Sequence, residues 1–116
     1  MTAFDPGLVE EAFEDDLQGL SAFVRSVLSS LQSGVQRVRD AIAARDAPAI
    51  RAAAHAVKGS SSHLGAADVG RHAAVIEDAA REGRVESSET VEALARAIGA
   101  LEAIVEDYLK SRASRA

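Results

Sequence analysis

The chain has 116 residues, a formal net charge of -5 and no cysteine, so it has room for one domain and cannot form a disulfide or a cysteine zinc site. Aromatic residues make up 3% of the chain, and alanine supplies a large share of the 47% that is hydrophobic. This composition favours helices and argues against an all-β sandwich or barrel. The basic residues are dispersed and no apolar run is long enough to span a membrane, so we expect neither nucleic acid nor a membrane as a partner.

The first two helices are predicted from capping residues and apolar spacing. Asp5 followed by Pro6 forms an N-cap and first-turn pair, which predicts a short helix to about Phe13. The acidic residues that follow can cap a second helix, because apolar side chains recur every three or four positions over 17–42. We expect this long helix to be weakened locally at Gly34.

Three further helices are predicted by the same rules, over about 47–64, 68–83 and 89–110. Asp46 and Pro48 repeat the start signal, and Gly65 is expected to stop the first of these helices. Residues 86–89 supply the start signal of the last helix, and residues 111–116 are expected to form a frayed polar tail.

Four long helices joined by short connections favour antiparallel neighbours. We therefore predict a single all-α domain over 1–116, with a structured part of about 5–110. Its fold is an antiparallel up-down-up-down four-helix bundle with a short extra N-terminal helix laid across one end. The acidic N-terminus lacks the pattern of a signal peptide, and the chain lacks cysteine, so we expect a cytoplasmic protein.

The helix predicted over 47–64 has one apolar stripe, formed by Ile50, Ala53, Ala54, Val57, Ser61 and Leu64. At 100° per residue, His55 lies on the opposite face, together with Arg51, Lys58, Gly59 and Ser62. We therefore expect the imidazole of His55 to face solvent.

The neighbours of His55 suit phosphoryl acceptance. A neutral imidazole is a competent nucleophile, and the Lys58 ammonium, three residues on, can offset the charge of a phosphoryl group. Gly59 costs helix stability, and the close approach of another protein to His55 would explain it. On spacing alone, an ordinary solvated histidine and lysine on a bundle surface is the stronger interpretation.

Residues 54–66 read AHAVKGSSSHLGA, which resembles the signature of histidine-containing phosphotransfer (HPt) domains of bacterial phosphorelays: Ala-His, then Lys-Gly-Ser, then Leu-Gly-Ala. The wider resemblance covers roughly residues 5–109. It implies that His55 is phosphorylated, that Lys58 assists the phosphoryl group and that Gly59 leaves space for the partner. Ser62 and His63 are less typical of the pattern and could tune partner choice.

The resemblance also implies partners and a function. The partners are receiver domains of response regulators, which bring an aspartate and Mg²⁺, and a hybrid sensor histidine kinase. The chain would accept a phosphoryl group from one receiver aspartate and relay it to another, as a monomer, with no cofactor and no ATP-dependent kinase activity of its own. A different class of function, a non-catalytic helical adaptor that binds receiver or kinase domains, stays as the alternative.

Folding the His55 helix back on its successor about the turn at 65–67 places Glu77 opposite His55. A carboxylate there could accept a hydrogen bond from imidazole Nδ1 and leave Nε2 exposed. The alternative for Glu77 is a solvated carboxylate paired with Arg81 at i+4. By the same count, Arg51 and Arg81 could extend a positive rim for receiver docking, or they are plain surface arginines.

A metal site is not expected. His63 and His72 do not form a ligand set with His55, because their spacing is wrong and no His-Glu-x-x-His pattern is present.

Overall fold

The computed structural model describes residues 3–85 and 88–115, and five α-helices account for most of this part of the chain. In order they are α1 (Pro6–Phe13), α2 (Leu17–Ala43), α3 (Ala47–Ser62), α4 (Ala67–Arg81) and α5 (Ser88–Arg115). No strand occurs within these described ranges, so the predicted all-α class is confirmed.

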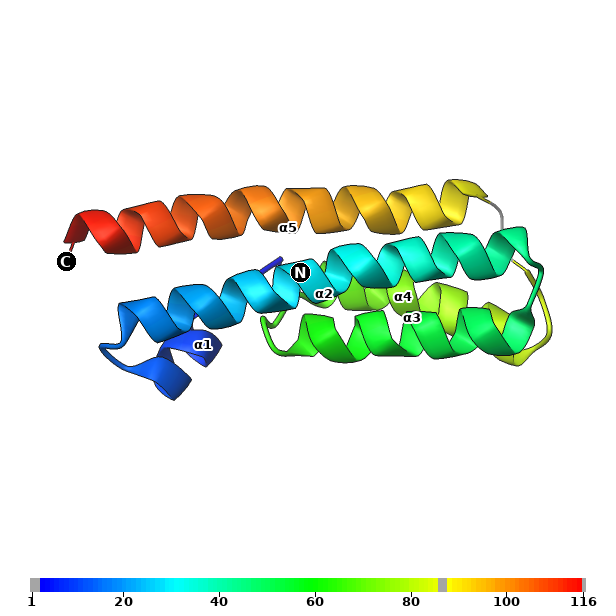
Figure 1. Ribbon diagram of the computed structural model, residues 1–116, viewed down its shortest axis with the longest axis horizontal. Coiled ribbons are helices and arrows are strands. Elements are labelled where there is room, and N and C mark those ends of the chain that lie inside the picture. Colours follow the sequence, from blue (N-terminus) through cyan, green and yellow to red (C-terminus); the bar gives the residue numbers. More distant parts are fainter. Residues whose placement is uncertain (1–2, 86–87, 116) are drawn as a thin grey trace.

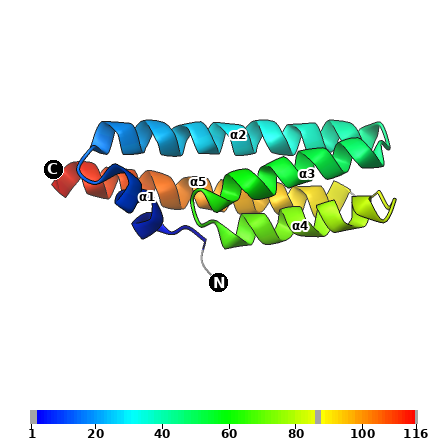
Figure 2. The same ribbon diagram turned by 90° about the horizontal axis from the view of Figure 1, so that it is seen from below.

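The four long helices run alternately up and down (Figure 1). The two longest, α2 and α5, lie side by side along the molecule, and α3 and α4 form a shorter hairpin against one half of them (Figure 2). Helix α1 packs against the start of α2, at the end that the hairpin does not reach. The predicted antiparallel four-helix bundle with an extra N-terminal helix is therefore confirmed.

The helix starts follow from side-chain caps. Asp5, Asp16 and Asp46 each stand directly before a helix, and each carboxylate accepts a hydrogen bond from the backbone N–H three residues on. These caps satisfy amide groups that have no partner within the helix. The proposed signal at Glu86 and Ser87 lies outside the described residues.

The helix ends differ from prediction in α3, α4 and α5. Helix α4 ends at Arg81, two residues before the expected end at residue 83. Helix α3 ends at Ser62, slightly before the expected Leu64, and the turn that follows uses a positive φ of 59° at Gly65. Helix α5 continues to Arg115, so the expected frayed tail is wrong for residues 111–115. This segment contains no helix breaker, and Arg112 reaches back to Glu10 of α1, with 3.8 Å between its Nε and Oε1.

Gly34 is a packing position and does not interrupt α2. It is buried, and a Cβ atom built on it would lie 2.6 Å from Cγ2 of Val57 on α3. The absence of a side chain therefore lets α2 approach the helix that carries His55. Helix α2 is continuous from Leu17 to Ala43, so the expected local weakness at Gly34 does not interrupt the helix.

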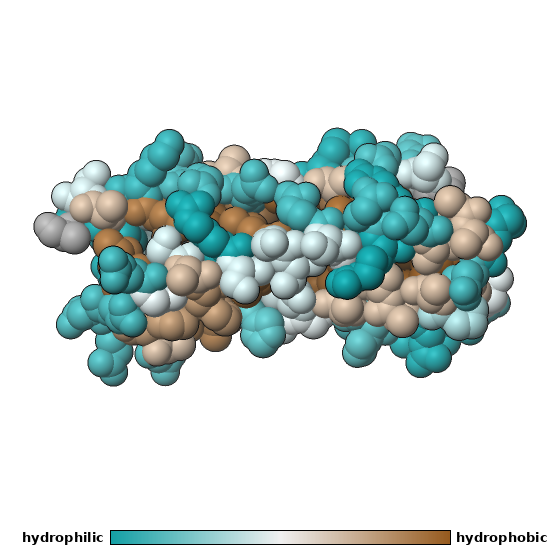
Figure 3. Space-filling view, viewed as in Figure 1, coloured by the Kyte–Doolittle hydropathy of each residue, from teal (hydrophilic) through white to brown (hydrophobic). Residues whose placement is uncertain are grey.

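The core is a strip of aliphatic side chains from all five helices, and its brown surface shows in narrow seams between teal side chains (Figure 3). Polar pairs join the exposed edges of α2 and α5: Arg25 with Glu106, Gln32 with Glu102 and Arg39 with Glu92. Among the residues described, none of the helices is both long and apolar enough to cross a membrane.

Candidate functional site

His55 projects from the outer face of α3. Its side chain is 70% exposed, while the apolar stripe on the other side of the helix is buried. Arg51, Gly59 and Ser62 are exposed on the same outer face, and Lys58 is half-buried. The predicted orientation of His55 toward solvent is confirmed.

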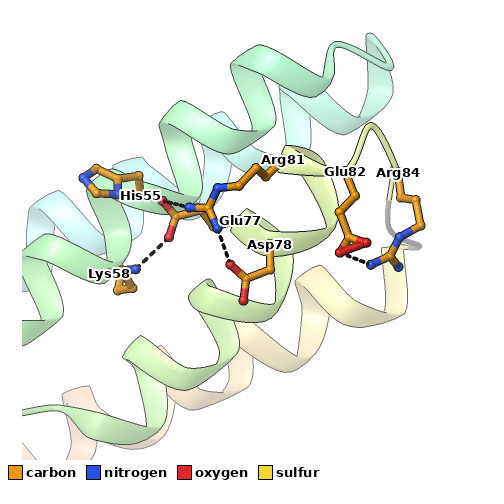
Figure 4. Close-up of polar contacts among 7 residues, drawn as sticks. All are labelled: His55, Lys58, Glu77, Asp78, Arg81, Glu82 and Arg84. Atoms are coloured by element: carbon orange, nitrogen blue, oxygen red, sulfur yellow. Dashed lines mark hydrogen bonds and ion pairs between the residues drawn. The ribbon is translucent and has the colours of Figure 1, made fainter.

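Glu77 on α4 faces His55 across the hairpin (Figure 4). Its Oε2 lies 2.7 Å from Nδ1 of His55, although the Glu77 side chain is only 3% exposed. The predicted pairing of the two residues is confirmed, and the alternative of a solvated Glu77 is wrong. Because a carboxylate accepts hydrogen bonds, it selects the tautomer with the proton on Nδ1 and leaves the Nε2 lone pair available.

Lys58 binds the other oxygen of the same carboxylate. Its Nζ lies 2.8 Å from Oε1 of Glu77, so the ammonium group that we expected to meet a phosphoryl group already has an anionic partner. Burial raises the pKa of the Glu77 carboxyl, but the hydrogen bonds and charges of Lys58 and His55 outweigh burial and hold the pKa below its ordinary value. Glu77 is therefore a buried anion that its two neighbours stabilise.

The sequence of α4 places this carboxylate at the edge of the core. Ile76 and Ala80, which are its neighbours on the helix, are buried in the bundle, and so is Ala73 one turn earlier. On α3, Ala54, which precedes His55, is also buried. Small side chains such as those of Ala54, Ala73 and Ala80 let two helices pack closely, which helps to bring the Glu77 carboxylate within reach of the His55 ring.

Arg81 and Arg51 both lie next to the cluster. Arg81 approaches Oε2 of Glu77 at 3.6 Å and pairs more closely with Oδ1 of Asp78, at 2.9 Å. Arg51 lines a shallow groove between α3 and α4 together with Pro48, Ala52, His55, Glu77 and Arg81. The sequence analysis missed Asp78, although its position three residues before Arg81 is a recognised spacing for ion pairs on a helix.

No side chain projects far from the surface of α3 at Gly59 and Ser62, next to His55. A Cβ atom on Gly59 would meet no other atom within 4 Å, so this glycine relieves no contact inside the molecule. The Ser62 hydroxyl donates a hydrogen bond to the Gly59 carbonyl at 2.6 Å and so lies against its own helix. The face next to the imidazole is therefore open to a partner.

The other two histidines lie elsewhere. His63 packs edge-on against Phe23, with 6.1 Å between ring centroids, and His72 lines a separate groove between α4 and α5. Within residues 3–85 and 88–115, no three histidine, aspartate or glutamate side chains gather in an arrangement that could hold a metal ion.

A four-helix bundle that carries an exposed histidine with its inner nitrogen fixed by a buried carboxylate has the architecture of a protein that presents an imidazole nucleophile to a partner. A comparison with protein-family models matches residues 22–108 to the Hpt domain. The chain therefore belongs to the Hpt domain family, and its function is histidine phosphotransfer in a phosphorelay.

The fold is also that of a solved structure. Histidine-containing phosphotransfer protein B from Pseudomonas aeruginosa PAO1 superposes with a TM-score of 0.84 and 20% sequence identity, over 94% of this chain and 96% of that one. At this identity the likeness shows the fold alone. No curated protein matches the chain in a sequence search.

Proposed function

We propose that His55 is the residue that accepts the phosphoryl group, from the aspartate of a receiver domain, and passes it to the aspartate of another. The observation that carries this proposal is the 2.7 Å contact between Nδ1 of His55 and Oε2 of Glu77. It directs the free lone pair of the ring to Nε2, on a side chain that is 70% exposed. An acyl phosphate on a second protein can reach that nitrogen without any movement of the bundle.

In the forward step, the Nε2 lone pair forms a bond to phosphorus while the bond between phosphorus and the aspartate oxygen breaks. The bond's electron pair stays on the aspartate, which becomes a free carboxylate. The bundle supplies the nucleophile and its position, and the receiver brings Mg²⁺, which stabilises the charge on the phosphoryl oxygens. Lys58 supplies the second positive charge, and Glu77 positions the ring.

The docking surface that we propose for the receiver surrounds His55. It includes Gly59 and Ser62 on one side of the histidine and Arg51 and Arg81 along the groove on the other. Gly59 and Ser62 carry no side chain that projects toward a docked receiver. The two guanidinium groups can form ion pairs with acidic side chains of the receiver. In this proposal the protein acts as a monomer in the cytoplasm, and a hybrid sensor kinase is the source of the phosphoryl group.

The test is phosphorylation by a receiver domain that carries ³²P on its aspartate. We expect His55→Gln to fold normally and accept no label, while His63→Gln and His72→Gln still accept it. Label on His55→Gln, together with its loss from either other variant, would show that the nucleophile is wrongly assigned. A wild-type chain that binds the receiver but takes no label would favour the adaptor function instead.

A further inference from the structure

One carboxylate holds two side chains that the reaction needs. Oε2 of Glu77 lies 2.7 Å from the Nδ1 atom of His55, and Oε1 lies 2.8 Å from Nζ of Lys58 (Figure 4). The Glu77 side chain is only 3% exposed, so losing one partner without compensation would leave an unpaired negative charge in surroundings of low dielectric. Arg81 lies farther from Oε2 of Glu77, at 3.6 Å, and pairs more closely with Asp78, so the departure of Lys58 costs least when another positive charge takes its place at the carboxylate.

Phosphoryl transfer creates that charge at the right atom. Before transfer the ring is neutral, and Lys58 balances Glu77. When Nε2 gives its lone pair to phosphorus and Nδ1 keeps its proton, the ring becomes cationic, and this cation already lies against Oε2 of Glu77. No proton is gained or lost in this step, and the positive charge that Glu77 needs is then supplied by His55.

We propose that Lys58 exchanges partners during the reaction: it binds the Glu77 carboxylate before transfer and the phosphoryl group on His55 afterwards, while the phosphorylated imidazole replaces it at Glu77. This inference rests on the proposed function of His55. Lys58 lies one turn along α3 from His55, and its side chain is 43% exposed, so its flexible stem can turn toward the phosphoryl group. Glu77 also keeps the proton on Nδ1, which makes the return step easier because the ring leaves as neutral imidazole.

The chain offers a direct probe of this exchange, because Lys58 and Lys110 are its only lysines. Protein labelled with ¹⁵N and ¹³C at lysine gives two side-chain signals by NMR, and Lys110, which is exposed on α5, serves as the internal reference. Phosphoramidate, a small phosphoryl donor, is the probe for phosphorylation. We expect the Lys58 signal to shift several-fold more than that of Lys110, and ¹⁵N-histidine spectra to show Nδ1 still protonated.

Two matched variants test the role of the Glu77 charge. Glu77→Gln keeps the shape and the acceptor oxygen for Nδ1–H but cannot hold Lys58 or a cationic ring. Glu82→Gln makes the same change of charge at an exposed residue, which pairs with Arg84 away from the cluster. We expect Glu77→Gln to move the Lys58 signal before any phosphorylation and to lengthen the lifetime of the phosphorylated form by roughly tenfold, and Glu82→Gln to do neither.

The outcomes separate this inference from the function on which it rests. A wild-type protein that takes no phosphoryl group on His55 would overturn both. Phosphorylation of His55 with a Lys58 signal that moves no more than that of Lys110 would overturn the exchange of partners and leave the phosphotransfer function intact. Equal lifetimes for phosphorylated Glu77→Gln and Glu82→Gln would refute the role given to the buried charge.

Discussion

Replacing glycine with alanine should have opposite effects on the free energy of unfolding at Gly34 and at Gly59. Alanine is more favourable than glycine in a helix interior by about 0.8 to 1.0 kcal/mol. At Gly59 nothing within 4 Å opposes the new methyl group, so Gly59→Ala should increase the free energy of unfolding by about this amount. At Gly34 the methyl group would lie 2.6 Å from Cγ2 of Val57.

The contact at Gly34 cannot be relieved cheaply. Val57 is 1% exposed and its branched side chain has few alternative rotamers, so α2 and α3 would have to separate. Overpacking of this kind typically costs about 1 to 3 kcal/mol. After the gain in helix propensity, Gly34→Ala should lower the free energy of unfolding by up to about 2 kcal/mol.

Urea unfolding followed by circular dichroism measures both effects, with Gly99→Ala as the control because its Cβ also meets no atom within 4 Å, on α5. With a slope near 1.5 kcal/mol/M, a difference of about 1 to 3 kcal/mol separates the midpoints of Gly34→Ala and Gly99→Ala by roughly 0.7 to 2 M. Equal midpoints for these two variants would show that the contact between Gly34 and Val57 does not set the spacing of α2 and α3.

The remaining predictions concern transfer, pH and the end of α5. Gly59→Glu should slow transfer from a phosphorylated receiver strongly without lowering the free energy of unfolding, because Glu is a better helix former than Gly; wild-type transfer would exclude docking over Gly59. Because the pKa of Glu77 is lowered in the folded protein, its carboxylate contributes stability above pH 4.5, and this contribution is lost as the pH falls through the lowered pKa. In urea unfolding at pH 3 to 7, the free energy of unfolding should therefore fall more steeply with acid for wild type than for Glu77→Gln. Parallel curves for the two proteins would contradict the ion pairs of Glu77. Truncation after Lys110 removes the contact of Arg112 with Glu10 and should lower thermal stability by less than about 1 kcal/mol; a larger loss would show that the last turns of α5 are part of the core.

Helix starts could be predicted because their causes are local. A carboxylate at Asp5, Asp16 or Asp46 binds an amide three residues away, and that interaction depends on neighbours in the sequence alone. The end of α5 is a different case. Between residues 110 and 115 no side chain is buried, so apolar periodicity stops at Leu109. The backbone hydrogen bonds of the helix continue, because this segment contains no helix-breaking residue.

The packing role of Gly34 could not be predicted from the sequence. A glycine within a helix pattern indicates a local cost, and nothing in the pattern says whether another helix uses the space. The sequence did contain a signal, since Gly34 lies in line with Val27, Leu31 and Val38 on the buried face of α2. A glycine in a buried stripe is more informative than one on an exposed face, because only the former can set the distance between two helices.

The position of Glu77 could be predicted and its burial could not, for two separate reasons. A short turn fixes which residues of α3 and α4 face each other, so counting about the turn was enough to pair His55 with Glu77. Burial depends on whether cations cover the carboxylate, and the sequence analysis had directed Lys58 toward a phosphoryl group instead. In the structure, Nζ of Lys58 lies 2.8 Å from Oε1 of Glu77. A sequence motif names the residues that a reaction requires, whereas the structure shows which contacts between helices hold those residues in place.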